Sequence, residues 1–198
     1  MTHPFRLGLT GSIGMGKSTT ARLFAEEGIP VWDADATVHG LYQKDGAAVQ
    51  AIAQAFPQAV QDGAVQRALL KKALVEDKQA FSRLETIVHP LVRAARAAFL
   101  QAHAGAEIVL LDVPLLYETG GEKDCDAVLV VTADPQVQRE RVLARGQMTE
   151  AQLDLILARQ MPDAEKRARA DYIIETRSLD QVRVAVRDLI KTIKAAHA

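Results

Sequence analysis

The clearest pattern in the sequence is a series of short, mostly apolar runs. Each run is bounded by glycine, aspartate or proline, and segments of helical periodicity separate the runs. This succession is typical of β-α-β units, and strands that are apolar on both faces are typical of a parallel sheet covered by helices. We therefore predict an α/β fold with a parallel sheet of about five strands flanked by helices. The predicted strands are Arg6 to Thr10, Pro30 to Trp32, Ile108 to Asp112, Ala127 to Thr132 and a weaker one at Tyr172 to Glu175.

Residues 36–103 depart from this rhythm. Their apolar positions recur at three- and four-residue spacing, which predicts helices and no strand. The expected helices are Ala47 to Phe56, Ala64 to Val75 and Gln79 to Leu100. We interpret the segment as a helical insertion between the second and third strands. There it would stand over the carboxyl ends of the strands, where open α/β sheets bind ligands.

A second helical segment, residues 135–169, follows the fourth strand and is rich in arginine. The last helix carries Val182, Val186, Leu189, Ile190 and Ile193 on one face, which predicts packing against the sheet. The predicted organisation is a core of residues 1–35, 104–134 and 170–198, an insertion at 36–103 and an arginine-bearing segment at 135–169.

Composition narrows the class of protein further. The chain has 198 residues, 48% hydrophobic and 25% charged, with a formal net charge of −1, which suits one globular α/β domain with a small insertion. There is no global basic field to attract nucleic acid. The single cysteine, Cys125, forms no disulfide within the chain. With neither a signal peptide nor a membrane-length apolar run, we expect a soluble cytoplasmic protein without a membrane or nucleic-acid partner.

The segment from Gly11 to Ser18 reads Gly-x-x-x-x-Gly-Lys-Ser, which is the pattern of a phosphate-binding loop. An apolar run enters it and a helix-forming run leaves it, as this loop requires. Its backbone N–H groups and the N-terminus of the following helix would face phosphate oxygens. Lys17 would reach the β- and γ-phosphates, and the Ser18 hydroxyl would coordinate Mg²⁺. A glycine-rich turn without a ligand is the alternative, but the flanking elements favour binding of a nucleoside triphosphate.

Three aspartates end predicted strands or follow them. Asp33 would accept a proton from an attacking hydroxyl, or would instead cap the next helix. Asp35 has the same two interpretations. Asp112 stands where a Walker B carboxylate would lie near Mg²⁺, although many strands simply end in aspartate. No cysteine–histidine cluster has metal-ligand spacing, so any metal is expected to be Mg²⁺ that arrives with the nucleotide.

The arginine-rich segment has two interpretations as well. Arg141 and Arg145 lie one helical turn apart and so face the same way, whereas Arg139 does not. They would close over ATP as a lid and neutralise charge on the transferring phosphoryl group, or they would form a solvated basic face. His89, in an apolar helix, is interpreted as a packed side chain or as a substrate contact.

Three classes of phosphate-loop protein compete. A small-molecule kinase accounts for the insertion, the aspartate base and the arginine lid. A GTPase would need Asn-Lys-x-Asp to recognise guanine, and the chain contains no asparagine. A non-enzymatic ATP-dependent module gives no reason for the insertion. A kinase fits best.

At this level of detail the chain resembles the dephospho-CoA kinase family over nearly its whole length. The resemblance is carried by Leu9 to Ser18, by Asp33-Ala34-Asp35, by Leu84 to Leu91 with its His-Pro pair, by Val113 to Glu118, by Arg141, Arg145 and Gln160, and by Ala170-Asp171. The departures are Ser12, Thr176 where the family commonly has asparagine near the adenine, and Gly146-Gln147, of which Gln147 lies outside the residues that the structure describes.

The resemblance implies transfer of the ATP γ-phosphoryl group to the ribose 3′-hydroxyl of dephospho-CoA, giving coenzyme A and ADP. Asp33, Lys17 and Arg141 are then the expected catalytic residues. The insertion becomes the acceptor-binding region with Asp35, Arg67 and His89 as substrate contacts, and Mg²⁺ is held at Ser18 and Asp112. The expected ATP-binding residues are Gly11, Ser12, Ile13, Gly14, Met15, Gly16, Lys17, Ser18, Thr19 and Arg145. We expect a monomer or a small homo-oligomer.

Overall fold

The structure is a computed structural model that describes residues 3–77, 79–146 and 148–197. Contacts divide the chain into two compact units. The sheet unit contains the chain up to Trp32 and from His103 onward, and the helical unit is Asp33–Ala102. The sequence predicted an insertion at 36–103, and the arginine-rich segment 135–169 lies within the sheet unit.

The sheet unit is built on one five-stranded sheet with the order β2-β5-β1-β6-β7. The strand pairs β1–β5, β1–β6 and β6–β7 are parallel. The five predicted strands are therefore confirmed, with shifts of one residue at the first two. The strands are β1 (Phe5–Thr10), β2 (Val31–Asp33), β5 (Ile108–Asp112), β6 (Ala127–Thr132) and β7 (Tyr172–Glu175).

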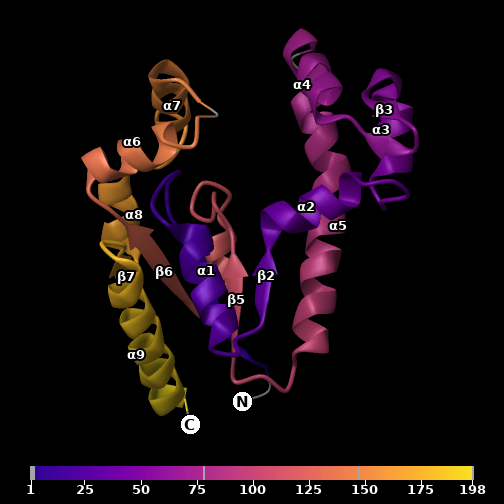
Figure 1. Ribbon diagram of the computed structural model, residues 1–198. Coiled ribbons are helices and arrows are strands. Elements are labelled where there is room, and N and C mark those ends of the chain that lie inside the picture. The colour runs from indigo at the N-terminus through magenta and orange to yellow at the C-terminus, as the bar shows by residue number, and fades with distance from the viewer. Residues whose placement is uncertain (1–2, 78, 147, 198) are drawn as a thin grey trace. The chain divides into compact units, whose positions relative to one another are not determined.

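Both faces of this sheet are apolar and covered, which explains why the strands read as apolar runs. Alternate side chains of β6 point to the two faces of the sheet. Leu129 and Val131 join the larger core with α1 (Lys17–Glu26) and α9 (Leu179–His197). Val128 and Val130 join a smaller cluster on the other face. The predicted stripe of α9 is buried as expected, and the start of β1 lies beside the end of α9, where the ring centroids of Phe5 and His197 are 4.5 Å apart (Figure 1).

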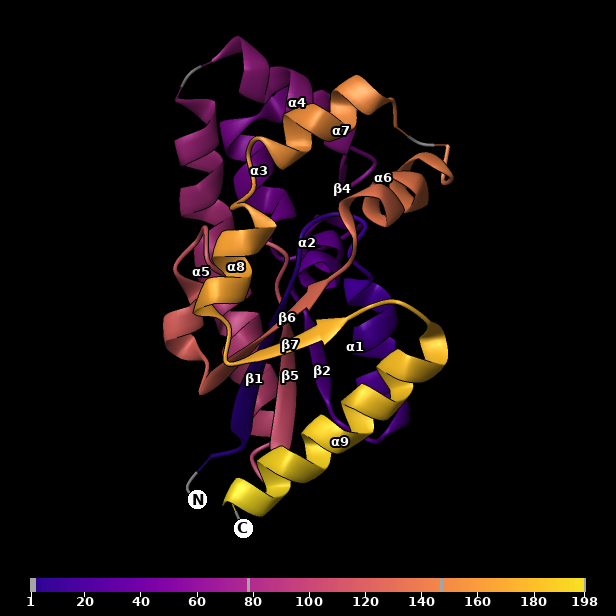
Figure 2. The same cartoon turned by 90° about the vertical axis from the view of Figure 1, so that its left-hand side faces the viewer.

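The segment between β6 and β7 forms three short helices, as its pattern predicts. They are α6 (Pro135–Leu143), α7 (Glu150–Leu157) and α8 (Asp163–Arg169), and a 3₁₀ turn at Gly121–Asp124 precedes β6. Figure 2 shows α8 and α9 in orange and yellow, with β7 joining them.

The helical unit contains α2 (Ala34–Tyr42), α3 (Val49–Ala55), α4 (Arg67–Glu76) and α5 (Ala80–Ala102), with a 3₁₀ turn at Pro57–Ala59. Its own core includes Ile52, Phe56, Leu70 and Val88. The expectation of no strand here was wrong, because a two-stranded antiparallel hairpin pairs β3 (Val60–Gln61) with β4 (Ala64–Val65).

The hairpin turn explains this difference. Asp62 and Gly63 both have positive φ, 52° and 75°, which closes a tight reversal and not a helix. The helix predicted from Ala64 therefore begins only at Arg67.

Candidate active site

The phosphate loop connects β1 to α1 at the carboxyl end of the sheet's central strand. Gly14 and Gly16 have φ values of 80° and 90°, a left-handed conformation that side chains disfavour. Met15 N donates to Ser12 O at 3.1 Å and closes a turn inside the loop. The motif thus folds as a nest of backbone amides leading into the N-terminus of a helix, which is an anion-binding arrangement.

Gly14 is also required because α6 packs directly on the loop. A Cβ atom at Gly14 would lie 2.6 Å from Val142 Cγ2 and 2.9 Å from Gln138 O. Real side chains do not fit at such distances. The first helix of the arginine-rich segment is therefore in van der Waals contact with the loop.

Lys17 and Asp112 form an ion pair beside the loop. Lys17 Nζ donates to Asp112 Oδ1 at 2.7 Å, and the two side chains are 14% and 3% exposed. Asp112 ends β5, the neighbour of β1, so the sheet itself brings this carboxylate to the loop lysine. Asp112 therefore lies beside the lysine of the loop.

A cavity of about 220 Å³ adjoins the loop. Arg141 and Arg145 both line it, as do Gly14, Gly16, Thr19 and Thr176. Arg141 is half-buried and donates from Nη1 to Thr176 Oγ1 at 2.8 Å and from Nη2 to Thr176 O at 2.5 Å. Two guanidinium groups beside the loop give this cavity the positive charge that a polyphosphate needs.

Arg139 faces a different set of groups. Its guanidinium lies 2.7 Å from Asp154 and 3.9 Å from Glu150, which raises the pKa of Arg139.

A larger cavity of about 290 Å³ lies at the amino ends of the strands, lined by residues such as His3, Ile108 and His197. Ligands of open α/β sheets bind at carboxyl ends, so the smaller cavity is the candidate site.

The aspartates Asp33 and Asp35 lie at the start of the helical unit. Asp33 ends β2 and is the N-cap of α2, since its Oδ1 accepts from Ala36 N at 2.9 Å. Asp35 is exposed in the first turn of α2. The capping interpretation of Asp33 is thus observed. A carboxylate has a second oxygen, so capping leaves an acceptor for another partner.

The remaining candidates belong to two other helices of the helical unit. Arg67 begins α4 and its guanidinium lies 5.9 Å from the ring centroid of Tyr42. Burial raises the pKa of Tyr42, and Arg67 opposes that shift. His89, on α5, is 56% exposed and lies 3.9 Å from Glu85, so it is not the packed side chain that the apolar pattern favoured. Asp35, Arg67 and His89 all belong to the part of the chain that the structure describes, and no hydrogen bond or ion pair joins them to one another there.

Sequence reasoning missed three side chains that contact the loop. Thr176 Oγ1 donates to Met15 O at 2.9 Å, and Gln138 and Gln160 both contact the backbone of Ile13. These contacts join residues far apart in the chain. No local pattern reports them, and Gln160 stood out only as part of a resemblance.

The donors available for a metal are oxygens. Ser18 lies at the start of α1 and is exposed, and Asp112 ends β5. A hydroxyl and a carboxylate suit Mg²⁺, which takes oxygen ligands and keeps several from water and phosphate. Across the described stretches of the chain, no group of three or more histidine, cysteine, aspartate or glutamate side chains could hold a metal ion by itself.

None of the helices that the structure describes is both long enough and apolar enough to cross a membrane.

Comparison with known proteins agrees with the geometry. A family model described as dephospho-CoA kinase matches residues 5–181. The dephospho-CoA kinase of Cereibacter sphaeroides is 63% identical over 192 residues, which covers 97% of each chain. The crystal structure of TT1252 from Thermus thermophilus superposes with a TM-score of 0.83 at 34% identity, covering 96% of this chain and 98% of that one.

A second solved structure bears on the fold alone. The dephospho-CoA kinase from Campylobacter jejuni has a TM-score of 0.66 at 21% identity, over 95% of this chain and 96% of that chain. The family model and the relative from Cereibacter sphaeroides name the same family. The chain belongs to the dephospho-CoA kinase family.

Proposed function

We propose that the protein transfers the γ-phosphoryl group of ATP to the ribose 3′-hydroxyl of dephospho-CoA, giving coenzyme A and ADP. Family membership over residues 5–181 supports the reaction. The single structural observation that carries it is the cavity beside the phosphate loop, with Arg141 and Arg145 in its lining. Lys17 stands at the end of the same loop.

Positioning and electrostatics supply the catalysis in this proposal. The loop from Gly11 to Ser18, with Thr19, binds the phosphates of ATP, and Lys17 places a charge against them. Arg145 binds the nucleotide, and Arg141 stabilises charge on the transferring group. The segment 135–169 acts as the lid that excludes water, which would otherwise compete with the acceptor hydroxyl.

Asp33 is the proposed general base. It accepts the proton of the ribose 3′-hydroxyl as that oxygen attacks the γ-phosphorus and ADP leaves. Its capping bond to Ala36 N holds the carboxylate in one orientation. The capping role and the catalytic role are therefore compatible.

The helical unit is the proposed acceptor-binding region. Asp35, Arg67 and His89 come from α2, α4 and α5, and all three are exposed. Exposed cationic and polar groups suit an anionic, hydrogen-bonding acceptor such as dephospho-CoA.

Mg²⁺ is the proposed metal. Ser18 and Asp112 would hold it, and when bound with ATP it neutralises phosphate charge. We also propose a cytoplasmic protein, monomeric or a small homo-oligomer, that binds no nucleic acid.

The test is release of ADP by the purified protein with Mg-ATP, with dephospho-CoA, adenosine or AMP as acceptor. We expect strong turnover only with dephospho-CoA, yielding coenzyme A. Tight binding of Mg-ATP without turnover on any acceptor would instead support a non-enzymatic ATP-binding module.

The variant Asp33→Asn isolates the proposed base. Asparagine also caps helices, so the fold and the affinity for ATP are expected to persist while turnover is abolished. Asp33→Ala, which removes the cap as well, is the matched control for the structural role. Turnover of Asp33→Asn within about tenfold of the parent protein would exclude the general-base assignment.

A further inference from the structure

We infer that Gln138 and Gln160 are positioning residues that orient the phosphate loop for ATP. Both contact Ile13, the third residue of the loop, one from α6 and the other from the turn between α7 and α8. Gln138 lies on α6, near the entry to the segment 135–169, and Gln160 follows α7.

The two glutamines use opposite ends of their amide groups. Gln138 Nε2 donates to Ile13 O at 2.7 Å, and Gln160 Oε1 accepts from Ile13 N at 3.2 Å. The backbone leaves no choice in this assignment, since an N–H only donates and a carbonyl only accepts. The side chain of Gln138 is buried, with 5% of the residue exposed.

These bonds fix both peptide planes that flank Ile13. A trans peptide is planar, with its C=O and N–H on opposite sides. Gln138 holds the carbonyl of the Ile13–Gly14 peptide, so the N–H of Gly14 points the other way. Gln160 holds the N–H of the Ser12–Ile13 peptide, whose carbonyl accepts from Met15 N inside the loop. The glutamines thus orient the amides at the start of the phosphate nest.

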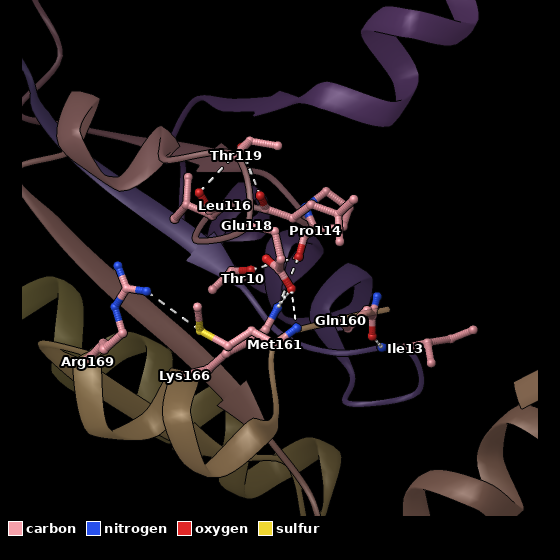
Figure 3. Close-up of polar contacts among 11 residues, drawn as sticks. Thr10, Ile13, Pro114, Leu116, Glu118, Thr119, Gln160, Met161, Lys166 and Arg169 are labelled. Atoms are coloured by element: carbon pink, nitrogen blue, oxygen red, sulfur yellow. Dashed lines mark hydrogen bonds and ion pairs between the residues drawn. The ribbon is translucent and has the colours of Figure 1, made fainter. Parts of the chain in front are cut away.

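An ion pair between the buried Lys166 and the partly exposed Glu118 anchors the residue next to Gln160 (Figure 3). Glu118 Oε1 accepts from Met161 N at 2.8 Å and lies 2.9 Å from Lys166 Nζ. The lysine is fully buried, and its amine also lies 3.5 Å from Pro114 O. Burial tends to raise the pKa of Glu118, but the bonds from Lys166 and Met161 together lower it. Met161, the residue after Gln160, is therefore anchored at its backbone.

Lys166 is also connected to the strand that leads into the loop. Thr10 Oγ1 donates to Pro114 O at 2.9 Å, so Pro114 O faces both Thr10, at the end of β1, and Lys166. The exit of the segment 135–169 and the entry to the loop are thus connected within the sheet unit. A shift of one changes the hydrogen bonds of the other.

The test compares ATP affinity among glutamine variants in the full-length protein by titration calorimetry. Gln138→Leu and Gln160→Leu each remove one bond and are expected to raise the Kd for ATP about fivefold. Melting temperature and the KM for dephospho-CoA are expected to change little. Gln136→Leu is the matched control, because Gln136 Nε2 donates to Glu140 on the same helix and not to the loop.

The glutamate variants give the sharpest contrast because they carry the same charge. A carboxylate at position 160 still accepts from Ile13 N, whereas one at position 138 cannot donate to Ile13 O. We expect Gln160→Glu to bind ATP about fivefold more tightly than Gln138→Glu. Equal affinities, the reverse order, or an equal loss in Gln136→Leu would overturn the inference. Because Gln160 is only half-buried, its leucine variant keeps the test available if Gln138 variants fail to fold.

The inference rests on the proposed function only in assuming that ATP is the ligand of the loop. If the parent protein binds ATP but does not phosphorylate dephospho-CoA, the proposed reaction fails while the affinity ranking still tests the glutamines. If the parent protein is active and the ranking is absent, the inference alone fails.

Discussion

The two units of the chain present their candidate residues in opposite ways. Around the phosphate loop, polar groups are bound by residues distant in sequence, such as Ile13 by Gln160, which lies 147 positions away. In the helical unit, Asp35, Arg67 and His89 are exposed. The groups around the loop are therefore oriented before a ligand arrives, whereas the exposed side chains of the proposed acceptor region are available to orient with their ligand. Loss of Arg141 should therefore affect turnover, and loss of Arg67 should affect the KM for the acceptor.

Arginines illustrate this difference. Arg141 makes two hydrogen bonds to Thr176 and lines the cavity, so its guanidinium is held at one place. Arg67 lies over the ring of Tyr42 at 5.9 Å and is exposed. A stacked arginine keeps its donors free for an anionic ligand. The most informative variants are those that test the fixed guanidinium of Arg141 and the exposed guanidinium of Arg67 separately.

Among the variants that compare the two arginines and their surroundings, the largest effect is expected for Arg141→Ala. If the guanidinium stabilises charge on the transferring phosphoryl group, turnover falls on the order of 10³-fold. Arg139→Ala is the matched control, since Arg139 lies on the same helix but pairs with Asp154. Steady-state kinetics with saturating substrates measures the effect. If turnover of a folded Arg141→Ala protein falls by less than about tenfold, this arginine has a structural role through its hydrogen bonds to Thr176 and not a catalytic one.

The second effect is on stability, not on chemistry. Lys166→Met leaves Glu118 without its buried cation, and we expect a loss of about 3 kcal/mol in the free energy of unfolding. Denaturant unfolding measures it. Arg169→Met is the matched control on α8, because Arg169 pairs with Glu122 and is 44% exposed. That variant should lose about 1 kcal/mol or less.

The pH dependence of the Lys166→Met protein sharpens the same prediction. The pKa of Glu118 in the folded parent protein lies below its ordinary 4.5, so its contribution is present above that pH and is lost as the pH falls through the lowered value. In the variant, protonation of Glu118 relieves the unpaired charge. The stability difference between the two proteins should therefore narrow in acid. A difference that stays constant down to about pH 3 would show that lost packing causes it and not the charge.

The same contrast explains how much of the fold and of the candidate site could be predicted from the sequence. The strands were predictable because both faces of the sheet are apolar, and the loop because its glycines and Lys17 follow a strand. The hairpin Val60–Val65 was missed because two-residue strands show no alternation and Asp62-Gly63 also ends helices. Gln138 and Gln160 were not predictable as loop contacts, since in sequence a glutamine in a helix or just after one looks like any solvated residue.

The smallest effect is expected in the helical unit. Arg67→Ala should raise the KM for dephospho-CoA about tenfold, because an exposed arginine that binds an anionic acceptor contributes one charge-assisted contact. The KM for ATP and the turnover at saturating acceptor should stay near those of the parent protein, which kinetics with each substrate varied in turn measures.

Arg83→Ala is the matched control for Arg67→Ala. The Arg83 guanidinium lies 5.4 Å from the ring centroid of Phe56, so it stacks on an aromatic ring of the same unit as Arg67 does, while its charge pairs with Asp77 at 2.8 Å. Loss of stacking alone would therefore affect both variants, and loss of acceptor binding only one. If the two variants raise the acceptor KM equally, then loss of packing anywhere in the helical unit weakens acceptor binding. The proposed role of Arg67 as a substrate contact would then be wrong.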